Sequence, residues 1–329
     1  MTVTTGTNQT YQMKGNREDL QDLIFNIDPV ETPFLSSLPK QKGNGTYTEW
    51  QTDALASAAV NAQVEGDAYA ATSATPTTRV GNYQQILTKI VSVSGSQEAV
   101  NKAGRKSEMA YQIAKKGKEL KRDLEKAVSG NGAGTAGSSS VGRTMAGSES
   151  WLATNRTSVG AADAGKMTTG WTTGGAPSPV DGSANGTFTE TSLKQVMQMC
   201  WTAGGEPKTV LVGPFNKTRA SKFAGIATIY RETKGSSQAT VVGAADVYVS
   251  DFGSVNIVPS RFNRDQTVQV LDPDYWALAT LRPLATEDMA KVGDSIQKAL
   301  VMETTLVCRN EKASGKVTEC VTSGTFTSG

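Results

Sequence analysis

Two short motifs contain residue types that could bind a phosphate or a cation. Gly132-Ala-Gly-Thr-Ala-Gly137 matches GxGxxG, a pattern in which close-packed glycines and the start of a following helix hold a pyrophosphate. That chemistry needs a strand before the motif and a helix after it. Here a charged helical stretch precedes the motif and Ser-Ser-Ser-Val-Gly-Arg follows. The motif is therefore interpreted as a loop, and no cofactor is expected.

The second motif resembles the first half of a calcium-binding loop. In Asp181-Gly-Ser-Ala-Asn-Gly186, Asp181, Ser183 and Asn185 supply side-chain oxygens at the first, third and fifth positions. The twelfth position is Ser192, whereas the calcium loop requires a bidentate Glu there. A turn before the next helix is the favoured interpretation, and the three oxygen side chains stay a candidate metal site.

Catalytic groups of the common kinds are scarce. The chain has no histidine, which removes the commonest general base and metal ligand, so most hydrolase mechanisms are disfavoured. Cys200, Cys308 and Cys320 form no CxxC pair and predict neither a disulfide framework nor a thiolate cluster. An SxxK match at Ser37–Lys40 lacks its companion motifs. An enzyme using carboxylates or lysines, with its site in residues 131–186 or after Val212, stays the rival hypothesis.

Composition narrows the class of protein. Among 329 residues, 33 Lys and Arg balance 31 Asp and Glu for a net charge of +2, which argues against a strong basic face for sequence-specific nucleic-acid binding. The N-terminal sequence has no basic and apolar signal pattern, and no window approaches the ~20 apolar residues that span a bilayer. We expect a globular protein in a reducing compartment, with no membrane partner.

The first part of the chain predicts outlying pieces. Residues 1–45 show little periodicity apart from a short helical face at Glu18–Phe25, so they predict an extended arm. Residues 45–94 predict a long hairpin, with a strand at Thr46–Trp50, a tip of small residues at Asp53–Pro76 and a return strand at Tyr83–Val93. Such a hairpin buries little of its own surface, so we expect it to lie on a partner.

The clearest helix is predicted from Ser96 to Ser129, with Ser94 or Ser96 as N-cap and Gly130 at its end. At 1.5 Å per residue it would be close to ~50 Å long. Its lysine-rich face is interleaved with Glu119, Asp123 and Glu125, which favours a solvated or subunit-pairing face over a phosphate-binding one. The lysine-rich face comprises Lys115, Lys116, Lys118, Lys121, Arg122 and Lys126.

The remaining chain mixes helices and strands. Residues 131–186 are rich in Gly, Ser and Thr and are predicted to be the least core-like stretch. Helices are predicted at Thr189–Ala203 and Phe215–Phe223. Strands are predicted at Val210–Val212, in a hairpin over Asp246–Val258, and at Thr267–Leu271, Trp276–Leu281, Ala299–Arg309 and Val317–Val321. Because these elements lack a regular βαβ alternation, the fold class is predicted to be α+β.

Several blocks, in order along the chain from about residue 16 to residue 318, resemble the major capsid proteins of tailed bacteriophages. The blocks are Arg17–Leu20, Ile27–Phe34, Glu49–Asp53, Val93–Val100, Lys102–Tyr111, Trp201–Gly205, Leu211–Pro214, Gly243–Asp246, Val249–Gly253 and Leu271–Asp274. The likeness fails mainly between residues 131 and 186.

The resemblance implies the Hong Kong 97-type capsid fold, and with it a division of the chain. Residues 1–45 would be an N-terminal arm, 46–92 an extended loop and 93–130 the spine helix of a peripheral domain. Residues 131–186 would be an insertion, 187–289 mainly an axial domain, and 290–329 the return strands of the peripheral domain. The implied function is self-assembly into an icosahedral head that encloses double-stranded DNA.

The resemblance also implies partners and contact positions. Partners would be many copies of the chain in hexamers and pentamers, a portal, a scaffold or decoration protein, and non-specifically held DNA, with assembly in the bacterial host cytoplasm. A non-viral nanocompartment shell of the same fold stays an alternative. The predicted subunit-interface residues are Phe34, Trp50, Arg79, Tyr83, Arg105, Lys106 and Arg122.

Overall fold

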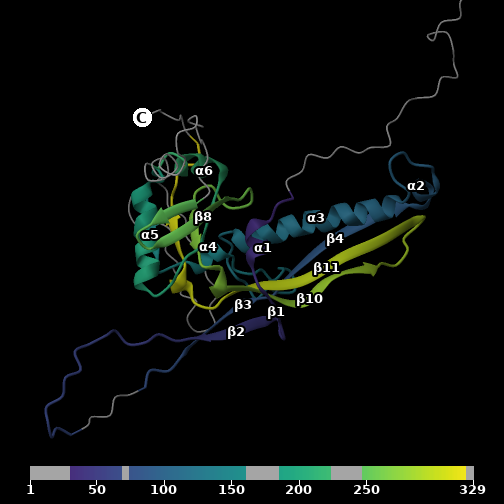
Figure 1. Ribbon diagram of the computed structural model, residues 1–329. Helices are drawn as coiled ribbons and strands as arrows, with labels where there is room; N and C mark the ends of the chain where they lie inside the picture. The colour runs from purple at the N-terminus through teal and green to yellow at the C-terminus, as the bar shows by residue number, and fades with distance from the viewer. Residues whose placement is uncertain (1–29, 69–73, 161–184, 224–246, 324–329) are drawn as a thin grey trace, which may run out of the picture.

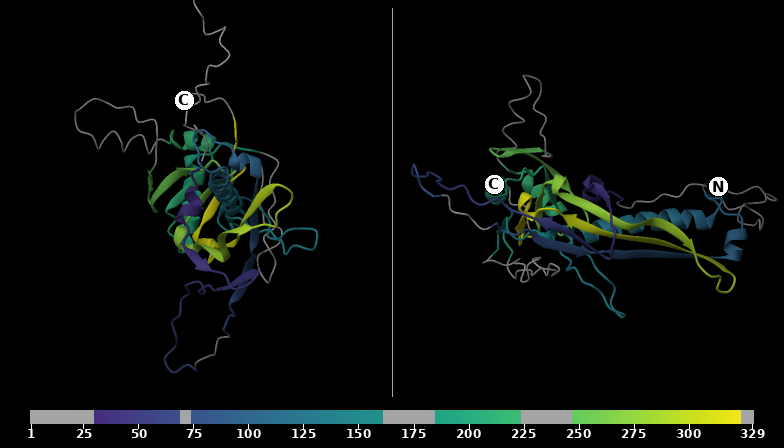
Figure 2. Two further views of the ribbon diagram at one scale, coloured as in Figure 1. Left: turned by 90° about the vertical axis from the view of Figure 1, so that its right-hand side faces the viewer. Right: turned by 90° about the horizontal axis from the view of Figure 1, so that it is seen from below.

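The computed structural model describes residues 30–68, 74–160, 185–223 and 247–323. Within these ranges the chain builds two β-sheets, a long helix and a separate two-stranded hairpin (Figure 1). The long helix and a four-stranded sheet form an elongated half, and a six-stranded sheet with helix α5 forms a broader half (Figure 2). The mixture of helices and strands confirms the predicted α+β class.

The described helices are α1 (Pro33–Ser37), α2 (Gly95–Ala99), α3 (Glu108–Ser129), α4 (Ser148–Trp151), α5 (Glu190–Thr202), α6 (Pro214–Ala220) and the 3-10 helices η2 (Pro273–Tyr275) and η3 (Glu311–Ala313). The described strands are β1 (Lys40–Lys42), β2 (Tyr47–Thr52), β3 (Thr78–Tyr83), β4 (Gln85–Ser94), β5 (Arg156–Ser158), β6 (Thr209–Val212), β7 (Val247–Ser250), β8 (Gly253–Pro259), β9 (Val268–Leu271), β10 (Trp276–Asp288), β11 (Ser295–Cys308) and β12 (Gly315–Thr318).

The four-stranded sheet has the order β1-β10-β11-β4, with β1 parallel to β10 and the other pairs antiparallel. Its central strands are longer than the predicted 276–281 and 299–309 segments. From Leu284 to Asp288 every residue of β10 is exposed, so this half of the strand carries no alternating apolar signal for sequence analysis to detect. It forms because its backbone pairs with β11.

Helix α3 packs along this sheet (Figure 1). Its buried Met109 and Leu120 contact Val91, Val93 and Leu300 from strands β4 and β11. The helix has 22 residues, about 33 Å at 1.5 Å per residue. The Ser107 hydroxyl caps it by accepting the backbone N–H of Ala110.

The prediction of one unbroken helix from Ser96 to Ser129 is wrong. Helix α2, capped by Ser94, ends at Ala99, because Val100 is extended. Gly104 then adopts a φ of +73°, which redirects the chain before α3 begins. Ser107 was a second competent N-cap in the sequence, and the structure uses both caps for two separate helices.

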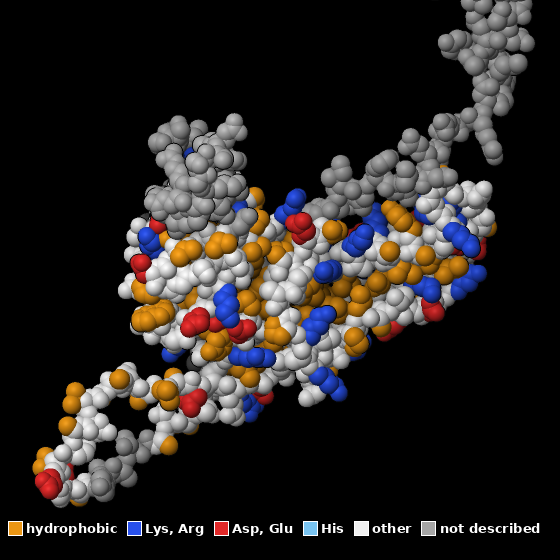
Figure 3. All heavy atoms as spheres, in the orientation of Figure 1, with side chains coloured by type: hydrophobic (Ala, Val, Ile, Leu, Met, Phe, Trp, Pro, Cys, Tyr) orange, Lys and Arg blue, Asp and Glu red, His pale blue; other side chains and the backbone are white. Residues whose placement is uncertain are grey.

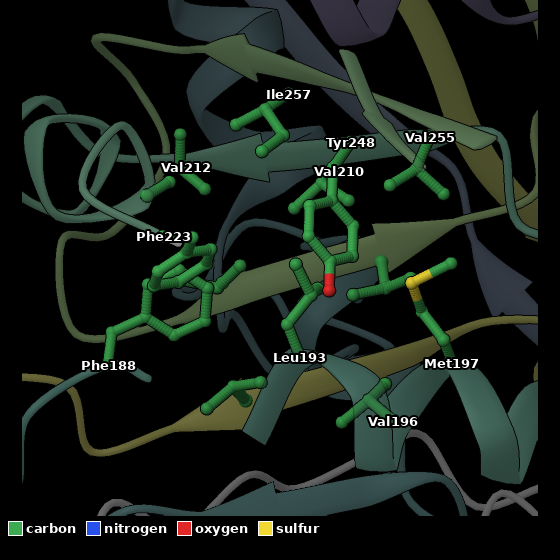
Figure 4. Close-up of a cluster of buried hydrophobic side chains, with 14 of the residues drawn as sticks. Phe188, Leu193, Val196, Met197, Val210, Val212, Phe223, Tyr248, Val255 and Ile257 are labelled. Carbon is green, nitrogen blue, oxygen red and sulfur yellow. The ribbon is translucent and has the colours of Figure 1, made fainter. Parts of the chain in front are cut away.

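The six-stranded sheet is mixed and has the order β5-β12-β9-β6-β8-β7. Helix α5 covers one face of it. Its apolar Leu193, Val196 and Met197 recur at i, i+3 and i+4 and face Val210 and Tyr248 of the sheet (Figure 4). The Thr189 side chain accepts the Ser192 backbone N–H and so begins the helix one residue after the predicted start.

A second cluster joins the two halves of the molecule. Trp276 and Leu306 from the long strands meet Leu271 of β9, Leu124 of α3 and Trp151 of α4. Trp151 lies in the stretch predicted to be least core-like, and that prediction is wrong for residues 145–152. All eight are buried, and Met145, Trp151 and Leu152 among them belong to this cluster.

The hairpin also differs from its predicted form. Strand β2 pairs antiparallel with β3, from Tyr47 opposite Tyr83 to Thr52 opposite Thr78. The predicted return strand continues past Gln84 as β4, but there it leaves the hairpin and pairs with β11. The hairpin therefore ends at residue 83, and its tip stands away from both sheets (Figure 1).

Candidate assembly surfaces

The base of the hairpin is held by cross-strand side-chain pairs. Arg79 donates from Nε and Nη2 to the two Glu49 carboxylate oxygens, at 2.7 and 2.9 Å. The Tyr47 and Tyr83 rings lie 4.6 Å apart between centroids. Burial, with smaller contributions from Tyr83 and Glu49, raises the pKa of Tyr47. A Cβ at Gly81 would lie 2.7 Å from the Tyr47 ring, so only glycine fits there.

Two residues fasten this base to the body. The fully buried Asn82 donates from Nδ2 to the carbonyls of Ala146 and Leu306, at 3.0 and 2.8 Å, and accepts the Ala146 N–H at 2.9 Å. Trp50 packs on Trp151 with ring centroids 5.4 Å apart. The base of the hairpin is thus part of the subunit core, and Trp50 contacts its own chain.

The hairpin tip (residues 53–77, described at 53–68 and 74–77) has no such support. Leu55, Val60 and Val64 are 100%, 97% and 76% exposed. Figure 3 shows hydrophobic side chains along a loop that stands clear of the body. Burial of such exposed apolar side chains against another molecule would lower the free energy, because it removes their surface from water. Leu55, Val60 and Val64 were not among the predicted interface residues. A large apolar residue at intervals of four or five positions, in a tip otherwise rich in small residues, was nevertheless a readable signal.

Phe34 occupies a different environment. It is 2% exposed and packs edge-on against Trp276, with centroids 6.1 Å apart. The backbone N–H groups of Phe34 and Leu35 donate to the buried Glu125 carboxylate of α3, at 3.1 and 2.7 Å. Burial raises the pKa of Glu125, partly offset by these two bonds. A side chain buried in its own subunit offers a neighbour little surface, and an interface role for Phe34 stays a prediction.

The predicted basic positions Arg105 and Lys106 lie just before α3, and Arg122 lies on it. Arg105 pairs with Glu108 and lies over the Tyr111 ring, 5.1 Å from the centroid. Lys106 is exposed beside it, whereas Arg122, on α3, lies 5.6 Å from the Phe262 ring centroid. The structure does not bring these residues together with the hairpin residues Trp50, Arg79 and Tyr83 at one site.

An exposed apolar patch lies at the far edge of the six-stranded sheet. Strand β7 is the edge strand, and Val247 and Val249 are 43% and 55% exposed on it. Trp201, at the end of α5, is 58% exposed and lies 5.6 Å from the Phe252 ring. Sequence analysis missed this patch. Trp201 follows Met197 by four residues, a spacing that groups it with the buried face of α5, so no sequence signal indicated its exposure.

The motifs that suggested small-molecule chemistry show no assembled site in the described residues. The Gly132–Gly137 run lies in a loop closed by a bridge between Thr135 and Thr144. Asp181 and Ser183 lie outside the described residues, and Asn185 is exposed. No group of three or more His, Cys, Asp and Glu side chains in those parts of the chain could hold a metal ion.

The three thiols and the described helices bear on redox chemistry and on membrane insertion. Cys200, Cys308 and Cys320 are free and buried, and burial raises the pKa of Cys200 and of Cys320 to about 12. No helix in the described ranges has the length and apolar character needed to cross a membrane.

Solved structures with similar folds are phage capsids and related shells. A cyanophage A-1(L) capsid chain aligns with a TM-score of 0.65 at 13% identity, covering 96% of this chain and 99% of that one. A chain from Microbacterium phage Oxtober96 aligns at 0.59 and 10%, covering 93% and 96%. The SrpI encapsulin of Synechococcus elongatus PCC 7942 aligns at 0.51 and 12%, covering 93% and 95%. The fold is therefore of the Hong Kong 97 type.

Sequence relatives are also capsid proteins. The major capsid protein of Escherichia phage Phieco32 is 28% identical, over 93% of this chain and 95% of its own length. The family described as SU10 major capsid protein matches residues 3–320. The chain belongs to the SU10 major capsid protein family, and it is a phage major capsid protein.

Proposed function

We propose that copies of this major capsid protein are tied into a closed head mainly by the hairpin tip of one subunit lying on the next. The observation that carries this proposal is the exposure of Leu55, Val60 and Val64, at 76% or more, on a tip whose base is anchored by Asn82. A rigid base aims the tip, and the apolar side chains supply the driving force for contact. Such head-to-tail contacts close rings of five or six copies.

We propose with it the division of the chain that the family resemblance implies. Residues 1–45 act as the arm, 46–92 as the extended loop and 93–130 as the spine of a peripheral domain. Residues 187–289 form mainly the axial domain, and 290–329 return to the peripheral domain. Pairing of β10 with β11, which in turn pairs with β4, supports moving residues 276–288 to the peripheral side of that boundary.

We also propose which residues contact neighbouring subunits and which partners complete the head. Arg79 and Tyr83 at the hairpin base and Arg105, Lys106 and Arg122 along the spine region are partly or fully exposed, which leaves them free to meet neighbours. The net charge of +2 suits a wall that encloses DNA without gripping it. A portal and a scaffold or decoration protein complete the head, which assembles in the host cytoplasm, and the role is structural rather than catalytic.

The test is removal of the tip. Replacing residues 53–77 with an Asn-Gly turn joins Thr52 of β2 to Thr78 of β3 by a favoured two-residue hairpin connection. We expect a soluble subunit with native circular dichroism that forms no shells in negative-stain microscopy. The matched control keeps the full length and exchanges three polar tip residues, Asn61, Gln63 and Thr75, for Ser. Normal shells from the deletion variant would contradict the proposed role of the tip.

A nanocompartment shell is the alternative function, and the fold likeness to an encapsulin is its support. The contents of native particles distinguish a phage head from a nanocompartment. Nuclease treatment of particles purified from the natural source should leave full-length DNA protected inside a phage head. Particles that contain protein cargo and no protected DNA would favour the nanocompartment.

A further inference from the structure

A groove of about 370 Å³ lies against α3, and Val30, the first described residue of the chain, is one of its lining residues. Val30 is 46% exposed. The lining includes Val30, Tyr111, Ala114, Lys115, Lys118 and Arg122. The groove is separate from the hairpin and from the exposed patch around Trp201.

The groove combines an apolar floor with positive charge. Lys115, Lys118 and Arg122 have no ion-pair partner among the described residues. Glu119 also lines the groove, but its carboxylate is paired with Lys116 at 2.7 Å. By contrast, Asp123 on another side of the helix pairs with Lys89 of β4 at 2.6 Å. The cations of the groove are therefore locally in excess.

The chain immediately before Val30 has the complementary pattern. Residues 18–28, EDLQDLIFNID, contain four carboxylates and neither Lys nor Arg. Leu20, Leu23 and Ile24 recur at i, i+3 and i+4, which predicts one apolar helical face. The carboxylates are Glu18, Asp19, Asp22 and Asp28.

We propose that residues 18–28 dock in this groove of their own subunit. The apolar face covers Val30 and Tyr111, and the carboxylates approach Lys115, Lys118 and Arg122. The groove follows α3 from Tyr111 to Arg122, about 17 Å at 1.5 Å per residue, and an eight-residue helix is about 12 Å long. Because residue 28 is joined to residue 30 by a single residue, the effective concentration of the segment at its own groove is high.

This docking changes the expected reach of the arm. If residues 18–28 are held on α3, only residues 1–17 remain to extend toward neighbours. The inference goes beyond the capsid function and does not rest on it, because it concerns a contact within one chain. The docking can therefore be measured on dissociated subunits, whether or not shells form.

Disulfide trapping tests the docking. In dissociated subunits of the full chain, Asp22→Cys with Lys118→Cys should form an intramolecular disulfide under mild oxidation, at least tenfold faster than Asp22→Cys with Asp123→Cys. The three native cysteines are buried and stay unreacted. Non-reducing gels and peptide mass spectrometry give the readout. Equal rates for the two pairs, no disulfide, or disulfide-linked dimers alone would overturn the proposal.

Charge reversal provides a second test that adds no cysteine. Lys118→Glu should raise the rate of chymotrypsin cleavage within residues 18–28 severalfold, since the segment then leaves its groove more often. Adding Asp22→Lys should restore the wild-type rate. Lys126→Glu, on the same helix but outside the groove, is the matched control. A cleavage rate that Lys118→Glu leaves unchanged, or that Asp22→Lys fails to restore, would overturn the proposal.

Discussion

The hairpin tip and residues 145–152 both come from stretches dominated by small residues, yet they have opposite environments. In the tip, Leu55 and Val60 are almost completely exposed. In the second stretch, Met145, Trp151 and Leu152 are at most 2% exposed. Composition alone does not separate the two stretches. The difference is whether the rest of the subunit supplies partners for their side chains and backbone.

Those partners can be named for the buried stretch. Asn82 satisfies both the N–H and the carbonyl of Ala146, and Gln269 accepts the Ser148 hydroxyl at 2.6 Å. The Glu149 carboxylate accepts the Thr267 hydroxyl at 2.7 Å. In the tip, the side chains of Asp53 and Asp67 accept only the backbone N–H of the next residue. One stretch therefore stabilises the subunit, and the other is available to stabilise the assembly.

Among the variants that compare these two regions, Trp151→Ala should cause the largest loss of subunit stability. The side chain is 1% exposed in the cluster that joins the two halves, so its loss should lower the free energy of unfolding by about 3–5 kcal/mol. Urea unfolding of dissociated subunits measures it. A loss below ~1 kcal/mol would show that residues 145–152 are not part of the working core.

Trp50→Ala should have an intermediate effect. From sequence alone, this change is expected to weaken assembly more than folding. The contact between Trp50 and Trp151 adds a cost to subunit stability of about 2 kcal/mol, because half-buried apolar area is lost. A double-mutant cycle with Trp151→Ala should give a coupling of ~0.5–1.5 kcal/mol. Zero coupling would place Trp50 outside the subunit core.

Glu125 is a buried carboxylate, so the pH dependence of stability tests what burial in the subunit core does to a polar group. Burial raises its folded-state pKa above the ordinary value of 4.5, so the folded state binds this proton more tightly than the unfolded state. The contribution to stability is then fully present below pH 4.5 and is lost as pH rises through the folded pKa.

Glu125→Gln does not titrate at this position and should flatten the decline in stability above pH 4.5. Unfolding free energies of wild type and variant, measured in parallel across this range, give the difference. Asp265 and Asp272, whose pKa values burial also raises, remain in both proteins and cancel in the comparison. Parallel curves for the two proteins would contradict the assignment to Glu125.

Replacing Leu55, Val60 and Val64 together with Ser should have the smallest effect on the subunit. Their side chains touch little of their own chain, so the free energy of unfolding should change by no more than ~0.5 kcal/mol. Shell yield in negative-stain images should nevertheless fall strongly. A subunit destabilised by more than 1–2 kcal/mol would show that the tip packs on its own body, which would remove the difference between the two regions.

Prediction from sequence succeeded where a local signal and a family resemblance agreed. The α+β class, the capsid family, α5 near its predicted ends and the hairpin around Asp251 were all predicted. The break before Ser107 was missed because two good N-caps stand in the sequence, and local rules cannot say whether one or both are used. The outer half of β10 was missed because its residues are exposed and its pairing with β11 is long-range.

By itself, the sequence determined what kind of protein this is, since ordered blocks of residues, small-residue tips and apolar periodicity are local and readable. The tertiary structure alone decided which small-residue stretch is core and which is surface. Met145–Leu152 is buried because Asn82, Gln269 and Trp276, distant in sequence, meet it in space. In the tip, by contrast, Leu55 and Val60 are almost completely exposed. Burial depends on such long-range partners, and no window of sequence contains them.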